Sequence, residues 1–159
     1  MEHKKKNPAN KKICLIASSG GHYEQLLMLK ALEETFDVYY VTEKTDYNGN
    51  DQNTYYIKQI NRREKLFVIN IVRIFFQSVK IFMKEKPDII ISTGALAVIP
   101  TFILGKAFKK KLIFIESFAK INSQTLTGKF IYKFSNVFFV QWEEMKQFYP
   151  DAIFNGPVY

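Results

Sequence analysis

One short segment, residues 18–22 with the sequence Ser-Ser-Gly-Gly-His, constrains the fold of this 159-residue chain more than any other. It follows the apolar run 13–17 and precedes a helix-like pattern over residues 23–34. A strand that turns into a helix on two glycines brings backbone N–H groups and a helix N-terminus together, which suits a phosphate or another anion. The alternative is that the turn is only a tight connection between the two elements.

His22 lies at the mouth of this predicted turn. Imidazole is the side chain best suited to moving protons near neutral pH. The turn lacks the third glycine of the dinucleotide-binding pattern G-x-G-x-x-G, and we predict no cofactor. The alternative is a histidine that only helps to cap the helix.

The composition indicates one domain with a substantial core. A chain of this length is too short for two full domains, and 47% of its residues are hydrophobic, with 15 Phe and 9 Tyr. Its single cysteine, Cys14, excludes an intramolecular disulfide and favours a reducing compartment.

Residues 1–12 are polar and rich in lysine, and we predict a disordered basic arm there, with the single domain over residues 13–159. The net charge of +8 favours an anionic surface as a partner. No zinc spacing, ribonucleoprotein motif or basic recognition helix occurs, so we predict no metal site and no nucleic-acid partner. Anionic lipid headgroups are the favoured surface.

Short apolar runs rich in β-branched residues alternate with helical patterns along the chain. The predicted strands are residues 13–17, 36–42, 54–60, 88–91, 112–115 and 137–140. The predicted helices are residues 23–34, 64–86, a segment ending near 108, 127–135 and a short one ending near 150. This alternation predicts an α/β fold: a single, Rossmann-like, doubly wound parallel sheet.

Distinctive segments follow four of the predicted strands. They are Gly20-Gly21-His22, Ser92-Thr93-Gly94, Glu116-Ser117 and Gln141-Trp142-Glu143. Ligands bind at the carboxyl ends of the strands in such sheets, so we predict a cleft at this edge. The alternatives without a ligand are purely structural: a tight turn at Thr93-Gly94, a helix cap or surface ion pair for Glu116, and a core position for Trp142.

The long predicted helix is unusually apolar. Between residues 66 and 83 its polar positions, Asn70, Arg73, Gln77 and Lys80, form one narrow stripe. Arg73 and Lys80 argue against a transmembrane span. Two interpretations remain, namely burial between the sheet and a neighbouring helix, or contact of the apolar face with lipid. The residues predicted to meet the membrane are Arg62, Arg63, Phe67, Ile71, Arg73, Phe75 and Lys80.

A set of motifs in a fixed order gives a family resemblance over residues 13–159. They are Ser-Ser-Gly-Gly-His at 18–22, Ile-Ile-Ser-Thr-Gly-Ala at 90–95, Phe-Ile-Glu-Ser-Phe-Ala at 114–119, Leu-Thr-Gly-Lys at 126–129 and Val-Gln-Trp-Glu-Glu at 140–144. The chain resembles the acceptor-side subunit of two-chain UDP-sugar transferases. This family includes the membrane-recruiting subunit of the eukaryotic enzyme that adds the second GlcNAc to dolichol-diphosphate-GlcNAc. It also includes bacterial capsule and exopolysaccharide subunits, which the chain resembles more closely.

The resemblance implies one half of a GT-B glycosyltransferase. This half looks like the N-terminal domain of the peptidoglycan transferase that makes lipid II, whose Gly-Gly-His loop faces the lipid-diphosphate acceptor. The donor-binding half is then expected to be a separate chain. The eukaryotic subunit usually carries an N-terminal membrane anchor, whereas only residues 1–12 precede the first predicted strand here. We therefore expect peripheral attachment to the inner, cytoplasmic face of the cell membrane.

The resemblance also implies a mechanism, in which an acceptor hydroxyl attacks the anomeric carbon of the UDP-sugar. His22 is the first candidate for the base, and Glu116 is the second; Glu116 can instead orient His22 or hold the acceptor sugar. The residues expected to bind the acceptor diphosphate are Ser19, Gly20, Gly21, Thr93, Gly94 and Ser117. Trp142 and Glu143 are expected at the interface with the partner chain.

Two other functions stay open at this stage. The first is a non-catalytic scaffold that recruits and activates a partner transferase at the membrane. The second is a free-standing nucleotide-binding protein, which predicts that this chain alone has measurable affinity for a UDP-sugar. We expect no such affinity, because no second glycine-rich phosphate loop and ribose-binding acid follow in register.

Overall fold

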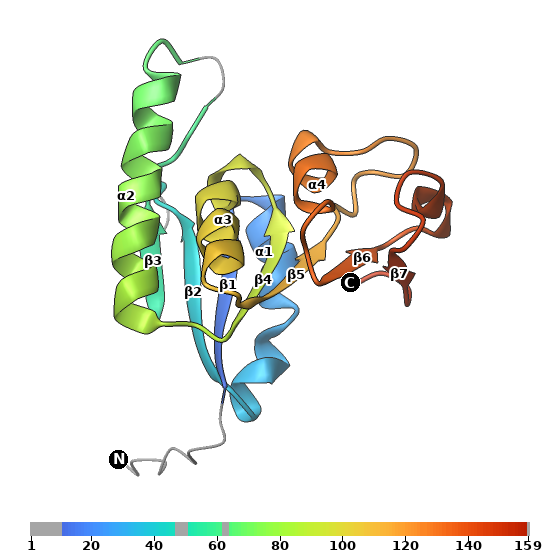
Figure 1. Cartoon of the computed structure of the whole chain (residues 1–159), viewed down its shortest axis with the longest axis horizontal. Coiled ribbons are helices and arrows are strands. Elements are labelled where there is room, and N and C mark those ends of the chain that lie inside the picture. Colours follow the sequence, from blue (N-terminus) through green and yellow to red (C-terminus); the bar gives the residue numbers. More distant parts are fainter. Residues whose placement is uncertain (1–10, 47–50, 62–63, 159) are drawn as a thin grey trace.

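The computed structural model describes residues 11–46, 51–61 and 64–158, and these residues form one parallel sheet with helices on both faces (Figure 1). The strands are β1 (Lys12–Ala17), β2 (Asp37–Glu43), β3 (Thr54–Ile57), β4 (Ile89–Gly94), β5 (Lys111–Ile115), β6 (Val137–Val140) and β7 (Ile153–Phe154). Their order in the sheet is β3-β2-β1-β4-β5-β6-β7, and every neighbouring pair is parallel. The predicted α/β class is confirmed.

The helices connect successive strands. The α-helices are α1 (Gly21–Leu27), α2 (Phe67–Glu85), α3 (Ile99–Ala107) and α4 (Leu126–Ile131). The described residues also form three short 3₁₀ helices, η1 (Lys30–Glu34), η2 (Leu96–Val98) and η3 (Glu143–Gln147). Helix α2 ends with Lys86 in the left-handed conformation, directly before Pro87, as the proline predicts.

The predicted element boundaries are wrong in several places. The helix predicted over residues 23–34 is broken, because the N–H groups of Met28 and Leu29 bond to carbonyls three residues back and tighten the chain. Strand β3 ends at Ile57 rather than residue 60, since the Ile60 N–H donates to the Glu43 side chain and not to a neighbouring strand. The helix predicted over residues 127–135 ends at Ile131, and the two-residue strand β7 was not predicted.

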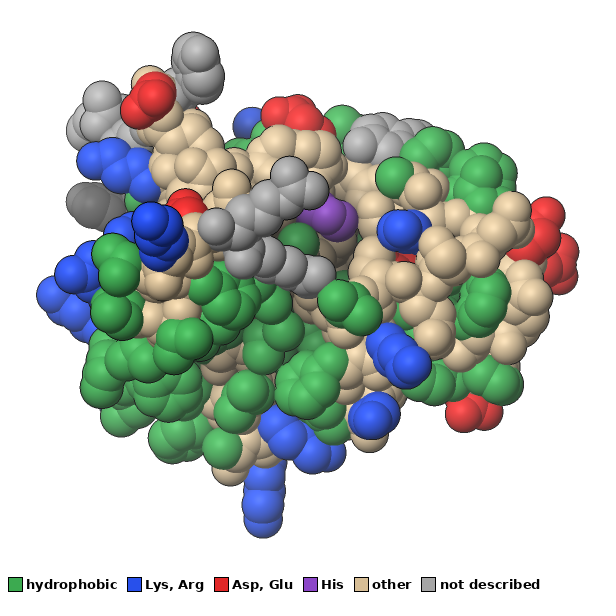
Figure 2. Space-filling view, turned by 90° about the horizontal axis from the view of Figure 1, so that it is seen from above, with side chains coloured by type: hydrophobic (Ala, Val, Ile, Leu, Met, Phe, Trp, Pro, Cys, Tyr) green, Lys and Arg blue, Asp and Glu red, His purple; other side chains and the backbone are tan. Residues whose placement is uncertain are grey.

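The strand order reverses between β1 and β4. From β1 the chain builds the sheet outward through β2 and β3, and from β4 it builds in the other direction. Figure 2 views the molecule onto the edge where the strands end. In open α/β sheets, ligands bind at this edge beside the switch point. The Gly-Gly-His turn follows β1 and Gly94 ends β4, so both flank the switch point.

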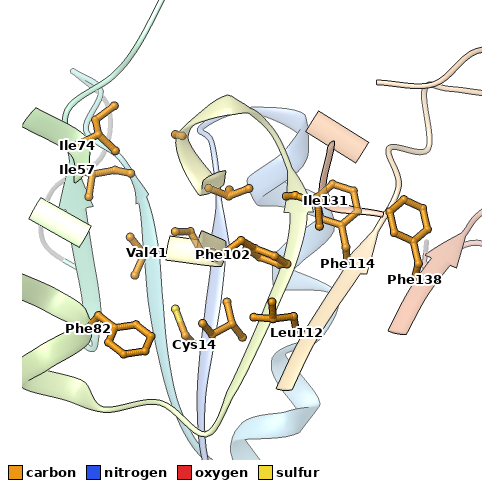
Figure 3. Close-up of a cluster of buried hydrophobic side chains, with 14 of the residues drawn as sticks. Cys14, Val41, Ile57, Ile74, Phe82, Phe102, Leu112, Phe114, Ile131 and Phe138 are labelled. Carbon is orange, nitrogen blue, oxygen red and sulfur yellow. The ribbon is translucent and has the colours of Figure 1, made fainter. Parts of the chain in front are cut away.

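Two hydrophobic clusters fill the space between the sheet and its helices. The larger cluster lies under α2, α3 and α4 and includes Ile74, Phe102 and Ile131, and the ring of Phe102 packs edge-on against Phe114 of β5 (Figure 3). The smaller cluster lies on the opposite face, where Leu26 of α1 packs against Leu15 and Ile91. Burial on both faces explains why the strands are nearly uniformly apolar.

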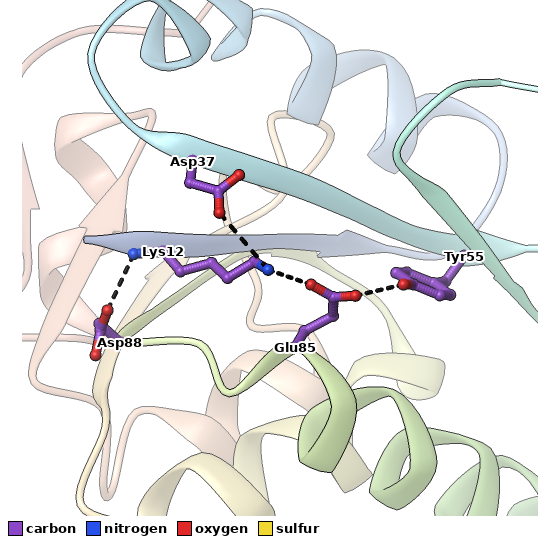
Figure 4. Close-up of polar contacts among 5 residues, drawn as sticks. All are labelled: Lys12, Asp37, Tyr55, Glu85 and Asp88. Carbon is purple, nitrogen blue, oxygen red and sulfur yellow. Dashed lines mark hydrogen bonds and ion pairs between the residues drawn. The ribbon is translucent and has the colours of Figure 1, made fainter. Parts of the chain in front are cut away.

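An ion-pair network joins the amino ends of the strands to the end of α2 (Figure 4). Lys12, which the sequence analysis placed in the basic arm, is the first residue of β1. Its ammonium group pairs with Glu85 and lies 3.6 Å from Asp37, while the Tyr55 hydroxyl also donates to Glu85. Burial opposes ionisation of Glu85, but the hydrogen bonds from Lys12 and Tyr55 outweigh it and lower the pKa of this carboxyl. The network stabilises the edge opposite the predicted cleft.

Helix α2 turns Asn70 and Gln77 of its polar stripe inward and leaves many of its apolar side chains exposed. Asn70 is buried and donates to Glu64 at 2.7 Å, and Gln77 accepts from the Lys58 N–H at 3.0 Å. The exposed side chains of α2 include Val68, Ile69, Val72, Phe75, Phe76 and Met83. The interpretation that α2 is wholly buried within this chain is therefore wrong. A surface of this kind marks an interaction site.

Figure 2 shows hydrophobic side chains gathered on the face over α2 and α3. Of the residues predicted to meet the membrane, Phe75, Arg73 and Lys80 are exposed, and Phe67 and Ile71 are half-buried. Arg62 and Arg63 lie outside the described residues. Within the described parts of the chain, no helix combines the length and apolar character that a bilayer span requires.

Candidate functional site

His22 is held by a reciprocal pair of hydrogen bonds to the end of β4. Its Nδ1 lies 2.7 Å from the carbonyl oxygen of Thr93, and the Thr93 hydroxyl donates to the His22 carbonyl at 2.6 Å. A carbonyl oxygen can only accept, so in the neutral ring Nδ1 carries the hydrogen and Nε2 carries the free lone pair. This geometry leaves Nε2 as the proton-accepting atom.

Gly94 packs against the imidazole ring. Its φ is +106°, and a Cβ at this position would lie 3.1 Å from two atoms of the His22 ring. The backbone of Gly94 is fixed from both sides, because its carbonyl accepts from the Ser18 N–H and its N–H donates to the Ser92 hydroxyl. Only glycine combines this backbone conformation with such close approach of the ring.

The turn before α1 holds a carboxylate that the sequence analysis did not single out. Glu43, at the end of β2, is 4% exposed, and its carboxylate accepts from the backbone N–H and the hydroxyl of Ser19, each at 3.2 Å. Ser19 is thus engaged within the protein. Among the described residues, no acceptor pairs with the amides of Gly20 and Gly21, so these are the free donors of the turn.

Glu116 is the centre of a buried network behind the loop that follows β5. It is 1% exposed. Its Oε1 accepts from the Ser117 N–H at 2.8 Å and the Thr125 hydroxyl at 2.9 Å. Its Oε2 accepts from the Tyr149 hydroxyl at 2.5 Å. Both oxygens are therefore occupied by donors from this chain.

This network also fixes the start of α4. The Thr125 hydroxyl accepts from the Gly128 N–H at 2.8 Å, which caps the helix. A Cβ on Gly128 would lie 2.1 Å from Glu116 Oε2, so only glycine lets α4 approach the carboxylate. Burial, together with the hydrogen bond to Glu116, raises the pKa of the Tyr149 hydroxyl, which keeps its proton and donates. The loop over residues 116–125 is thereby held at both ends.

A cavity of about 300 Å³ opens between His22 and this loop. Its walls are made by the β1–α1 turn, the end of β4 and the loop that leads into α4. The lining residues are His22, Gly94, Ala95, Glu116, Lys120, Gln124, Thr125, Leu126 and Thr127. Of the described residues that line it, Lys120 carries the positive charge, and its ammonium group makes only a long contact of 3.4 Å to the Ser123 hydroxyl. The lining offers both polar and apolar surface, and the lysine suits an anionic ligand.

The structure brings three of the predicted site residues, His22, Gly94 and Glu116, to this cavity. Thr93 lies behind it as the partner of His22, and Ser117 lies beside Glu116 with its N–H already donated. Ser19, Gly20 and Gly21 lie in the adjoining turn and do not line the cavity. Glu116 does not contact His22, since its partners come from its own loop and from Tyr149.

The predicted interface residues follow β6, and Trp142 lies against the start of the same loop. The Trp142 indole N–H donates to the Phe118 carbonyl at 2.7 Å, and the two rings are 4.9 Å apart. Glu143 is exposed at the start of η3. Gln141 is buried and donates to the Glu116 carbonyl at 2.8 Å. Trp142 and Gln141 thus hold the loop from the side of β6.

Sequence reasoning assigned no role to Lys120, Gln124, Thr125 or Tyr149. A signal existed for the first three, because they follow β5 at the same edge as the other site residues. Tyr149 carries no such signal. It reaches Glu116 across 33 positions of the sequence, a contact that only the fold creates.

Solved structures share this fold. The chain superposes on MurG of Acinetobacter baumannii with a TM-score of 0.67 at 15% identity, covering 84% of this chain and 42% of that one. It superposes on a UDP-N-acetylglucosamine 2-epimerase of Rickettsia bellii with a TM-score of 0.74 at 14% identity, covering 94% of this chain and 45% of that one. The chain thus spans less than half the length of these proteins and matches the N-terminal half of the GT-B fold.

Curated relatives match over nearly the whole chain. The UDP-N-acetylglucosamine transferase subunit ALG14 of Homo sapiens is 24% identical, over 92% of this chain and 82% of its own length. The subunit of the same name from Yarrowia lipolytica is 28% identical, over 93% of this chain and 81% of its own length. Residues 13–158 match the family described as "Oligosaccharide biosynthesis protein Alg14 like". The chain therefore belongs to the Alg14-like family of oligosaccharide biosynthesis proteins.

Proposed function

We propose that this chain is the acceptor-side subunit of a two-chain glycosyltransferase. The complex transfers a sugar from a UDP-sugar to a saccharide linked to a polyprenyl diphosphate. One observation carries the proposal, namely that the Nε2 lone pair of His22 is left free beside a lysine-containing cavity at the switch point of the sheet. The relatives named as subunits of a UDP-N-acetylglucosamine transferase support UDP-GlcNAc as the donor to test first.

His22 acts as the base in this proposal. As the acceptor hydroxyl oxygen attacks the anomeric carbon, Nε2 takes its proton, and UDP leaves with the electrons of the glycosidic bond. The Thr93 carbonyl, which accepts from Nδ1, holds the ring in place and stabilises the imidazolium that forms. Glu116 is the weaker candidate for the base, since both of its oxygens already accept hydrogen bonds and it is 1% exposed.

The cavity receives the head of the acceptor. Lys120 supplies positive charge for the diphosphate, and the free amides of Gly20 and Gly21 supply donors from the adjoining turn. Gly94 and Thr93 contribute by shaping the wall at His22. Ser19 and Ser117, two further predicted ligands, contribute indirectly, because each already donates to a carboxylate of this chain.

The donor-binding half is a separate chain in this proposal. The present chain supplies one Rossmann-like half, whereas the similar solved structures are about twice as long. The partner faces the carboxyl edge of the sheet, where Glu143 is exposed beside Trp142. In a two-domain arrangement of this kind, the acceptor lies between the halves and the base comes from this one.

The exposed apolar face of α2 and α3 is proposed to rest on the membrane. Phe76 is 65% exposed and Val68 is 71% exposed, and Arg73 and Lys80 are exposed on the same helix. Apolar side chains flanked by cations bind the surface of anionic bilayers. This contact is peripheral, on the cytoplasmic face, and brings the cavity to a lipid-linked acceptor.

The alternative is a non-catalytic scaffold that recruits and activates the partner. The resemblance of its motifs to those of bacterial capsule and exopolysaccharide subunits supports a role in extracellular polysaccharide synthesis, whether the chain is catalytic or a scaffold. Deletion of the gene should then abolish that polysaccharide.

Co-expression tests the enzyme proposal. The chain is produced together with the product of the neighbouring open reading frame, and transfer of radiolabelled sugar from UDP-GlcNAc and other UDP-sugars to lipid is measured on membranes. We expect transfer only when both chains are present. Failure to transfer with any partner or donor would overturn the proposal.

A further inference from the structure

A groove lined only by hydrocarbon side chains lies between α2 and α3. Ile71 and Phe75 form one wall, and Pro100 and Ile103 form the other. The groove has a volume of about 150 Å³, the size of an apolar cavity that stays dry and takes a benzene-sized group. It therefore suits hydrocarbon and offers nothing to a sugar or a nucleotide.

The groove adjoins the cavity beside His22 along the chain itself. Gly94 and Ala95 line the cavity, and the next two residues, Leu96 and Ala97, line the groove. Consecutive Cα atoms are about 3.8 Å apart, so the two spaces are neighbours. Ala95 and Leu96 are both half-exposed, which places the ridge between the spaces at the surface rather than behind a buried wall.

The groove also opens toward the apolar face of the molecule. Phe75 is 37% exposed and Ile103 is 43% exposed, while both line the groove. Figure 2 shows hydrophobic side chains gathered over α2 and α3, the helices between which the groove lies. A polar site with a lysine and an adjoining hydrocarbon groove together match an amphiphile whose anionic head is joined directly to its chain.

We propose that this groove binds the first part of the isoprenoid chain of the lipid-linked acceptor, with its diphosphate in the cavity beside His22 and Lys120. The inference rests on the proposed function, since it assigns the acceptor head to that cavity. It assigns the groove a role distinct from that of the outer face of α2, which contacts the bilayer.

Binding of farnesyl diphosphate to the full chain tests the proposal without a membrane or a partner. The affinity is measured by titration calorimetry and compared with that of inorganic diphosphate. Neighbouring residues of α2 provide matched variants, because Phe75 lines the groove and Phe76 does not. Both are exposed, so serine at either position leaves the core intact, which circular dichroism checks.

We expect farnesyl diphosphate to bind at least about tenfold more tightly than inorganic diphosphate. Phe75→Ser should remove most of this difference, and Phe76→Ser should change it by less than about twofold. Equal affinities for the two probes, or equal effects of the two variants, would overturn the proposal. If the two chains transfer sugar but this chain shows no such preference, the groove proposal fails and the proposed function stands. If this chain prefers farnesyl diphosphate in a way that depends on Phe75 but supports no sugar transfer, the groove proposal stands and the proposed function fails.

Discussion

The Nδ1 atom of His22 lies 2.7 Å from the carbonyl oxygen of Thr93, and this contact determines which ring nitrogen is free. Thr93 also donates its hydroxyl to the His22 carbonyl, so the turn after β1 and the end of β4 are tied together at the switch point. The ring is thereby held in one orientation before any ligand binds. A base positioned in this way needs no rearrangement when the acceptor arrives.

Gly94→Ala is expected to disturb both the backbone and the ring of His22. The residue has a φ of +106°, and the added Cβ would lie 3.1 Å from the imidazole. The expected loss of unfolding free energy is about 2–3 kcal/mol in urea denaturation, together with lower sugar transfer. Gly156→Ala is the control, because Gly156 also has a positive φ but open space around it. Equal losses for the two variants would show that contact with His22 is unimportant.

Tyr149→Phe is expected to destabilise the chain by removing one donor from the buried Glu116 carboxylate. The hydroxyl lies 2.5 Å from Oε2, and the expected cost is about 1–3 kcal/mol in chemical unfolding. Tyr56→Phe, which removes a hydroxyl from the exposed pair with Asp51, should cost less than about 0.5 kcal/mol. A Tyr149→Phe variant as stable as the parent protein would contradict the structural role given to Glu116.

Glu85→Gln is expected to reduce stability in a pH-dependent way. The pKa of Glu85 is lower in the folded chain than in the unfolded chain, so its contribution is complete above the unfolded value of about 4.3 and is lost as the pH falls through the folded pKa. We expect a loss of about 0.5–1 kcal/mol at pH 7 that shrinks in more acidic buffer. Urea unfolding across this range measures it. Glu34→Gln, at an exposed position, should leave the pH dependence of the unfolding free energy unchanged. A loss of stability in Glu85→Gln that grows as the pH falls would contradict the lowered pKa of Glu85.

Phe76→Ser is expected to weaken binding to vesicles that contain phosphatidylglycerol. The side chain is 65% exposed on the apolar face of α2, and its loss should lower the partition coefficient by about tenfold in flotation assays. Ile153→Ser, which changes an exposed apolar residue on β7, should bind as the parent protein does. Vesicle binding that is unaffected by Phe76→Ser would contradict the membrane contact.

The alternation of apolar runs and helical patterns was sufficient to predict the sheet and the edge at which the site lies. The runs that became β1, β4, β5 and β6 are short and continuously apolar, which is typical of strands buried on both faces. Strand β7 has only two residues, too few to show a periodicity. The break after Leu27 also carries no sequence signal, since it depends on how Leu29 and Leu32 pack under the sheet.

The candidate site was predictable in outline but not in its hydrogen bonds. His22, Gly94 and Glu116 follow strands and so were placed at one edge. The partners of Glu116 were not, because Tyr149 reaches it from 33 positions away. The orientation of α2 was not predictable from the pattern either, since Asn70 and Gln77 are held inward by Glu64 and by the Lys58 backbone. Contacts between residues far apart in sequence leave no periodic trace.

The turnover of the reconstituted pair with His22→Ala tests the central claim most directly. With UDP-sugar and lipid acceptor saturating, and with binding of the two chains measured in parallel, the account predicts that kcat falls by about 10²–10⁴-fold while the complex still forms. Full turnover by a His22→Ala complex would contradict the claim. It would show that His22 is not the base and that this chain serves as a scaffold.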